Sequence, residues 1–186
     1  SSDLDLDFNH YTTPRYGRVY YRADPTDQTS PILSVELQSV AEFNSLCRPD
    51  TIEMTWTAVV GGGSVTVSND STNAIVGVEI GTEITTIGNN FLYVCEYFNS
   101  PMVIPDNVTS IGNRFMSNNI TFNQPLTLSN NLTTIGNSFL DWCTQFDHPI
   151  SLPSSLTSIG FSFMTGAGSM VSTINVGALS DSVIAS

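Results

Sequence analysis

Ile84-Thr-Thr-Ile-Gly-Asn-Asn-Phe91 recurs 24 residues later as Val108-Thr-Ser-Ile-Gly-Asn-Arg-Phe115, and again as Leu132-Thr-Thr-Ile-Gly-Asn-Ser-Phe139. A fourth copy, Leu156-Thr-Ser-Ile-Gly-Phe-Ser-Phe163, follows in the same phase. A fixed period of this length is typical of a solenoid, in which each repeat folds as one small unit and stacked neighbours bury a shared core. The sequence therefore predicts a stack of similar coils.

Apolar residues keep the same phase in every repeat. Pairs two residues apart, such as Met102 and Ile104, alternate with polar residues, as in a short half-buried strand. The Thr-Thr/Ser-Ile segment predicts a second short strand in each coil. We expect the core to consist of columns of equivalent residues: Ile87, Ile111, Ile135 and Ile159; Phe91, Phe115, Phe139 and Phe163; Phe98, Phe122 and Phe146; Met102, Leu126 and Ile150; and Ile104, Leu128 and Leu152.

Glycine and proline punctuate the repeat. A proline stands before each of three strand pairs, in keeping with the place of proline at strand edges and corners: Pro101, Pro125 and Pro149. A glycine follows each in-phase isoleucine, where we expect a turn with positive φ: Gly88, Gly112, Gly136 and Gly160.

The segment from Ile87 to Pro105, Ile-Gly-x-x-Phe-Leu-x-x-Cys-x-x-Phe-x-x-Pro-Met-x-Ile-Pro, resembles the BspA-type leucine-rich repeat. The resemblance extends over residues 76–180 and departs from the usual pattern in placing Phe where Ala is commoner. It implies an all-β or mainly β protein, with a short leucine-rich-repeat solenoid of about four coils preceded by a small β-rich domain. It also implies a role in recognition, because such repeats occur widely on cell surfaces and in adhesion.

We divide the chain into a β-rich N-terminal domain or cap over residues 1–73, the solenoid over 74–180 and a tail over 181–186. Within the first part, residues 51–68 alternate around a triple glycine and predict a β-hairpin. Residues 32–47 predict a strand followed by a short helix. Alternating residues 3–8 predict an amphipathic strand with one acidic face rather than a calcium loop.

Arginine and tyrosine alternate in residues 15–22, so that one strand face would carry Tyr16, Arg18, Tyr20 and Arg22. Two interpretations remain open. The arginines pair across strands with the acidic face of Asp3 to Asp7, which we favour, or the four side chains form a partner-binding surface.

The charge of the chain limits its partners. The 17 acidic residues outnumber the 5 basic ones, all of which are arginine, and give a formal net charge of −12. Nucleic acid and anionic membranes need clustered cations, so we expect neither as a partner. No apolar run reaches the length of about 20 residues that a membrane span requires.

Neither a metal site nor a catalytic site is predicted. Cys95 and Cys143 occupy one column two coils apart, about 9–10 Å, which is beyond disulfide reach, so we expect buried free thiols. The two histidines are too few for a zinc site, and His148 lies in a repeat corner that we expect to be exposed. We therefore expect a protein that is not an enzyme and has no cofactor.

Two functions remain for such a chain. The first is a surface-exposed recognition or adhesion module, outside a cell or on a virion, that binds a protein or glycan through exposed strand residues. The second is a structural subunit that associates with itself or with other subunits in a larger assembly, such as a virion head, tail or fibre. For the first function, the candidate contact residues, besides those of the arginine–tyrosine strand, are Thr85, Thr109, Thr133 and Thr157, with Thr86, Ser110, Thr134 and Ser158 beside them.

Overall fold

The computed structural model describes residues 13–22, 24, 26–47, 54–60, 63–69, 75–168 and 174–175. These described residues contain one five-residue helix among strands, which confirms the predicted mainly β class. The described elements are β1 (Gly17–Arg22), β2 (Ile32–Glu36), α1 (Val40–Asn44), β3 (Met54–Val60), β4 (Gly63–Asn69), β5 (Ile75–Ile80), β6 (Thr86–Ile87), β7 (Met102–Val103), β8 (Ser110–Ile111), β9 (Leu126–Thr127), β10 (Thr134–Ile135), β11 (Ile150–Ser151), β12 (Ser158–Ile159) and β13 (Ile174–Asn175).

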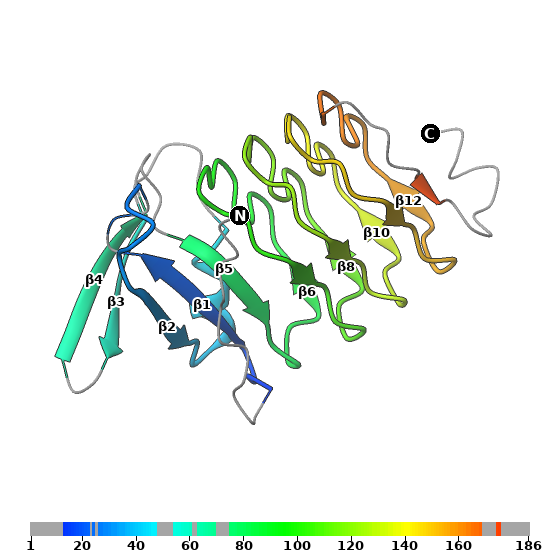
Figure 1. Cartoon of the computed structure of the whole chain (residues 1–186). Coiled ribbons are helices and arrows are strands. Elements are labelled where there is room, and N and C mark those ends of the chain that lie inside the picture. The colour runs from blue at the N-terminus through cyan, green and yellow to red at the C-terminus, as the bar shows by residue number, and fades with distance from the viewer. Residues whose placement is uncertain are drawn as a thin grey trace.

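The repeats stack side by side, as Figure 1 shows from β6 to β12. One parallel sheet joins β6, β8, β10 and β12 in that order, each strand offset from the next by one repeat. The strands predicted from the alternating pairs form a second ladder, in which β7 pairs with β9 and β11 pairs with β13. The 24-residue period therefore corresponds to one turn of the chain.

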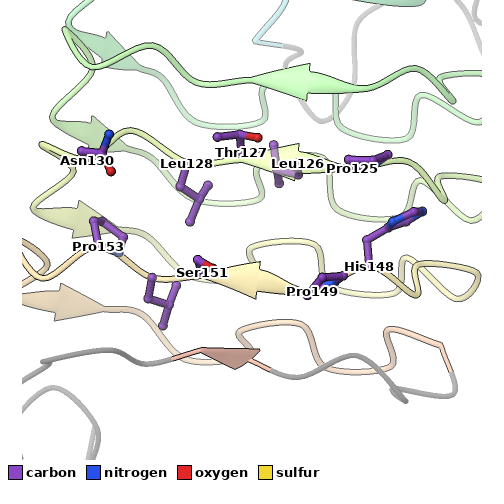
Figure 2. Close-up of a pocket in the computed structure, with 10 residues that line it drawn as sticks. Pro125, Leu126, Thr127, Leu128, Asn130, His148, Pro149, Ser151 and Pro153 are labelled. Carbon is purple, nitrogen blue, oxygen red and sulfur yellow. The ribbon is translucent and has the colours of Figure 1, made fainter.

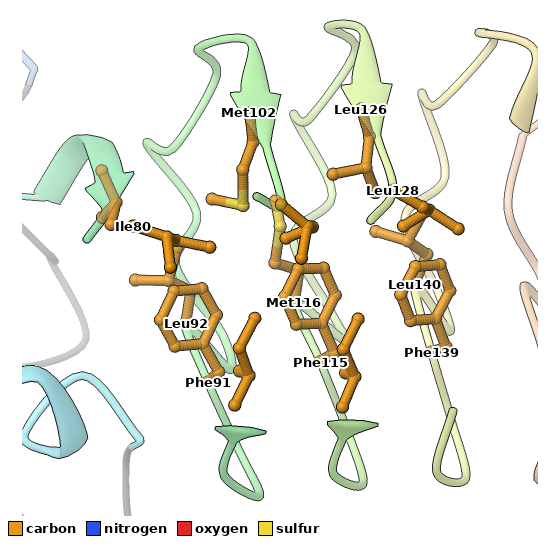
Figure 3. Packing of buried hydrophobic residues seen from close by; sticks show 14 of the residues in the cluster. Ile80, Phe91, Leu92, Met102, Phe115, Met116, Leu126, Leu128, Phe139 and Leu140 are labelled. Atoms are coloured by element: carbon orange, nitrogen blue, oxygen red, sulfur yellow. The ribbon is translucent and has the colours of Figure 1, made fainter. Parts of the chain in front are cut away.

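The predicted columns form the core. Phenylalanine rings stack along the coils, with centroids 5.4 Å apart between Phe91 and Phe115 and 5.1 Å apart between Phe115 and Phe139. Figure 3 shows these rings in line, with Leu92, Met116 and Leu140 aligned above them. Ile159 and Phe163, in the last coil, are only partly buried. Stacking thus removes from water the side chains that one coil alone would leave exposed.

The glycines that follow the in-phase isoleucines do not adopt positive φ, so this prediction is wrong. The described glycines with positive φ are Gly17 and Gly166. Three of the repeat glycines, Gly112, Gly136 and Gly160, are required instead by close contact with the preceding coil. A Cβ atom on Gly136 would lie 2.6 Å from the carbonyl carbon of Gly112, closer than real Cβ atoms approach.

Positive φ falls on three other residues of each coil, at alternate positions, such as Arg114, Met116 and Asn118. Their amides bond alternately to the next and the previous coil. Arg114 N donates to Asn137 O at 2.7 Å, and Met116 N donates to Phe91 O at 2.8 Å. Side chains at positive φ are strained, and these bonds to both neighbours hold the backbone there.

The N-terminal elements cover one end of the stack (Figure 1). The antiparallel sheet β2-β1-β5 stands there, and Phe43 of α1 stacks on Phe91 with centroids 5.5 Å apart. The backbone of Leu46 accepts a hydrogen bond from Leu92 N at 3.0 Å. One hydrophobic core therefore runs from Val19 to Ala167.

The structure confirms two further predictions in the N-terminal part. Residues 32–47 form the strand β2 and the helix α1, and β3 pairs with β4 as an antiparallel hairpin in which Val60 is opposite Gly63. The predicted boundaries at residues 73 and 180 lie outside the described residues, so the division into 1–73, 74–180 and 181–186 stays a prediction.

Candidate functional site

Two rows of hydroxyl side chains follow the sheet β6-β8-β10-β12. In each coil two outward residues stand between two inward apolar ones, as Thr85 and Thr86 stand between the buried Ile84 and Ile87. Strand stacking repeats each residue at intervals of about 4.8 Å. We call the resulting surface the hydroxyl face. It consists of the exposed Thr85, Thr109, Thr133 and Thr157 and the adjoining, exposed or half-buried Thr86, Ser110, Thr134 and Ser158.

The threonines of the first row are oriented by hydrogen bonds between coils. Thr133 Oγ1 donates to Thr109 O at 2.9 Å, Thr157 Oγ1 donates to Thr133 O at 3.0 Å, and Thr109 repeats the contact to Thr85 O at 3.4 Å. Since the hydroxyl proton is used inside the protein, the oxygen lone pairs remain to accept hydrogen bonds. The row therefore presents regularly spaced acceptors to a partner that carries donors.

The candidate residues of the N-terminal strand are oriented differently. Arg18 is 8 % exposed, and its guanidinium donates to Glu79 Oε2 at 3.0 Å and to Glu36 Oε2 at 3.3 Å. Both glutamates lie directly opposite Arg18 in the neighbouring strands. The acidic partners that we favoured, Asp3 to Asp7, lie outside the described residues.

The other members of that face are engaged in similar ways. Tyr20 is buried and its hydroxyl donates to Glu79 Oε2 at 3.1 Å; burial and the Glu79 carboxylate raise the pKa of Tyr20 to about 12. Arg22 is buried and donates to Gln28 Oε1 at 2.9 Å, whereas Tyr16 is half-buried. Arg18 and Tyr20 thus join strands of the three-stranded sheet, and Arg22 bonds to the loop between β1 and β2. None of the three joins the hydroxyl face.

A groove that sequence reasoning missed lies between β9 and β11. It has a volume of about 410 Å³ and is lined by residues 125–128, 130, 148, 149 and 151–153 (Figure 2). Leu126, Leu128 and Leu152 are buried, while Thr127 and Ser151 are exposed. The groove has an apolar floor and a polar rim.

The backbone ladder is interrupted at the same place. Between β7 and β9, Met102 N donates to Pro125 O at 3.0 Å and Ile104 N donates to Thr127 O at 2.8 Å. Among the described strands, β9 and β11 do not pair with each other. The equivalent amides, Leu126 N and Leu128 N, and the equivalent carbonyls, Pro149 O and Ser151 O, therefore face the groove without forming the ladder bonds.

The histidine and the two cysteines of the coils are buried or half-buried. His148 is half-buried rather than exposed as predicted, with Nε2 3.2 Å from Asn123 O. Cys95 and Cys143 are buried thiols, as predicted. Burial raises the pKa of the Cys143 thiol to about 12 and that of Cys47 to about 11. The described part of the chain contains no group of three His, Cys, Asp or Glu residues arranged to hold a metal ion.

The described part of the chain has no helix with the length and apolar character that a membrane span requires. Comparison with known proteins bears on the repeats: residues 70–183 match the family model described as a BspA type leucine rich repeat region (6 copies). The match covers more than half of the chain. Neither the curated proteins nor the solved structures include one that matches.

Proposed function

Because the chain belongs to the BspA-type leucine-rich repeat family, we propose that it is a non-catalytic recognition or adhesion module, exposed outside a cell or on a virion, that binds a protein or glycan. The observation that carries this proposal is the hydroxyl face, where four strands in parallel register hold equivalent threonines in a straight row. Its solenoid has about four coils, with the N-terminal β-rich unit as a cap.

The geometry favours binding because the face is ordered before a partner arrives. The Thr133 and Thr157 hydroxyls are fixed by bonds of 2.9 and 3.0 Å to the preceding coil, so little side-chain entropy is lost on contact. The net charge of −12 further favours partners that are neutral or basic.

Binding to arrays of glycans and of extracellular proteins tests the proposal. We expect the chain to bind a defined ligand, and Thr133→Arg to weaken that binding at least tenfold because it places a bulky side chain in the row. Gln145→Arg adds the same charge to an exposed loop of the same coil and serves as the control. Equal binding by both variants would remove the hydroxyl face from the proposal.

A subunit of a larger assembly is the second candidate function. Among the strands that the structure describes, β12 lies at one edge of its sheet, and an open strand edge is a template for pairing with another chain. Size-exclusion chromatography with light scattering separates the two functions. A stable monomer supports recognition, whereas a defined oligomer or filament supports assembly.

A further inference from the structure

We infer that the groove between β9 and β11 is a binding site for a neutral saccharide unit. The inference rests on the proposed recognition function and deepens it, because it names a ligand class and a second site of contact. It starts from the coincidence of two observations: β9 and β11 do not pair, and the structure is hollowed by about 410 Å³ at the same place.

The two walls of the groove offer opposite hydrogen-bonding groups. The amides of Leu126 and Leu128 line one wall and the carbonyls of Pro149 and Ser151 line the other, in place of the bonds that Met102 and Ile104 make in the preceding pair of strands. Peptide groups that are removed from water carry a free-energy cost unless they find partners. A ligand that accepts on one side and donates on the other satisfies both walls, and a hydroxyl group does both.

Charge excludes ionic ligands. The groove residues include no Asp, Glu, Lys or Arg. A carboxylate or phosphate would meet the carbonyl wall within a protein of net charge −12, and a cation would meet the amide wall. The ligand is therefore neutral.

Size excludes an inserted peptide strand. Two strands that admit a third between them stand about 9.6 Å apart, which is twice the normal strand spacing. Parts of β9 and β11 have Cα atoms within 8 Å of each other. The volume instead suits a small ring, since small-molecule pockets measure about 300–1,000 Å³.

The side chains suit the apolar face of a sugar ring. Pro125 and Pro149 lie at one end and Pro153 at the other, with His148 directed across the groove toward Pro125 in Figure 2. Rigid proline rings and an imidazole offer flat surfaces to C–H groups, while Thr127 and Ser151 place hydroxyls at the rim. A hexose or N-acetylhexosamine unit matches this combination of flat apolar contacts and paired donors and acceptors.

Amide NMR spectra of the intact chain test the inference with the methyl glycosides of glucose, galactose, mannose, N-acetylglucosamine and N-acetylgalactosamine as probes. In the free protein we expect the amides of Leu126 and Leu128 to exchange with solvent at least tenfold faster than those of Met102 and Ile104. At least one glycoside is expected to shift the Leu126 and Leu128 signals saturably and to slow their exchange. Equal protection of the two amide pairs, or no saturable shift with any glycoside, overturns the inference.

Matched variants locate the site. Ser151→Phe fills the rim of the groove and is expected to abolish the saturable shift, whereas Val103→Phe places the same ring at the equivalent exposed position of β7 and is expected to leave it intact. The saccharide assignment is overturned if the shifts persist in Ser151→Phe. It is also overturned if the peptide analogue N-acetylglycine methylamide shifts these signals and the glycosides do not. Because Thr133 does not line the groove, we expect Thr133→Arg to bind the glycosides as the wild-type chain does. Failure of the groove as a saccharide site is therefore distinguishable from failure of the hydroxyl face as a binding surface.

Discussion

Glycine is required at position 136 because the neighbouring coil leaves no room for a Cβ atom. Added there, the atom would lie 2.6 Å from Gly112 C and 2.7 Å from Asn113 N, which are backbone atoms that cannot rotate away. We expect Gly136→Ala to lower the free energy of unfolding by about 3 kcal/mol, measured by urea denaturation.

Gly88→Ala is the matched control for this prediction. A Cβ atom on Gly88 would meet only the Cys47 side chain, with Sγ at 3.1 Å. We expect Gly88→Ala to lower the free energy of unfolding by less than about 1 kcal/mol. Equal losses in the two variants would show that contact between coils does not determine the choice of glycine.

Asn119 shows how one buried side chain satisfies the backbone of another coil. Asn119 is fully buried and its Oδ1 accepts a hydrogen bond from Cys95 N, while its Nδ2 has no partner among the described residues. One coil further, the Cys143 thiol donates to Met116 O at 3.1 Å. We expect Asn119→Ala to lower the free energy of unfolding by about 1–3 kcal/mol, because it removes the buried side-chain oxygen that accepts from Cys95 N.

Asn119→Cys tests the reason for that loss. A sulfur at position 119 can take over the acceptor role and also removes the unpartnered amide, so we expect this variant to retain more stability than Asn119→Ala. Thermal and urea unfolding of both variants provide the comparison. If Asn119→Cys were the less stable of the two, the acceptor role would be wrong.

At the scale of elements, the phenylalanine column carries much of the coil-to-coil packing. Phe115 is fully buried between two rings, whereas Phe163 stacks on Phe139 at 5.2 Å and is only partly buried. We expect Phe115→Ala to lower the free energy of unfolding by about 3–5 kcal/mol and Phe163→Ala by about half as much. Equal costs, measured by urea denaturation, would contradict nearest-neighbour stacking.

The elements also show which features the sequence can predict. A column such as Phe91, Phe115 and Phe139 recurs at one period, and burial of a column requires only that the coils align. The positive φ of Leu92 and Val94 cannot be predicted from the sequence, because leucine and valine disfavour this conformation. Hydrogen bonds between coils impose it in the folded chain.

Two site features escaped prediction for related reasons. Pro125 and Pro149 repeat in phase like Pro101, so the sequence predicts a continuous ladder where the structure has a groove. Glu79, one of the two partners of Arg18, lies 61 residues away in the chain, beyond the reach of local patterns. The outward placement of the threonines could be predicted, because each pair of hydroxyl residues stands between two apolar residues, as Thr85 and Thr86 stand between Ile84 and Ile87.

At the scale of the whole molecule, burial of the Cys143 thiol makes the folded chain less stable as the pH rises into the alkaline range. The pKa of Cys143 rises from 9.0 to about 12, so above pH 9 the unfolded chain loses a proton that the folded chain keeps. The contribution of this buried thiol to the free energy of unfolding is therefore complete below pH 9 and is lost as the pH rises toward 12. We expect the free energy of unfolding to fall by about 2–3 kcal/mol between pH 9 and 11 on account of this thiol.

Urea denaturation at pH 8, 9, 10 and 11 measures this dependence, with Cys143→Ala as the comparison. The variant is expected to be less stable at pH 8 but to show a shallower decline above pH 9. Tyr20, Tyr21 and Cys47, whose pKa values are also raised, contribute to the decline that remains. A slope unchanged by Cys143→Ala would show that this thiol does not stay protonated in the folded chain.

Amide hydrogen exchange, resolved by residue in the intact wild-type chain, measures whether the stacked coils hold the hydroxyl face rigid. The coils are joined by amides that recur with the repeat: Thr109, Thr133 and Thr157 each donate to the preceding coil at 2.8–2.9 Å, as do Gly112, Gly136 and Gly160. We expect these six amides to be among the slowest to exchange, with protection that recurs every 24 residues. Rapid exchange at these positions, or protection without that period, would contradict a rigid solenoid and the recognition surface built on it.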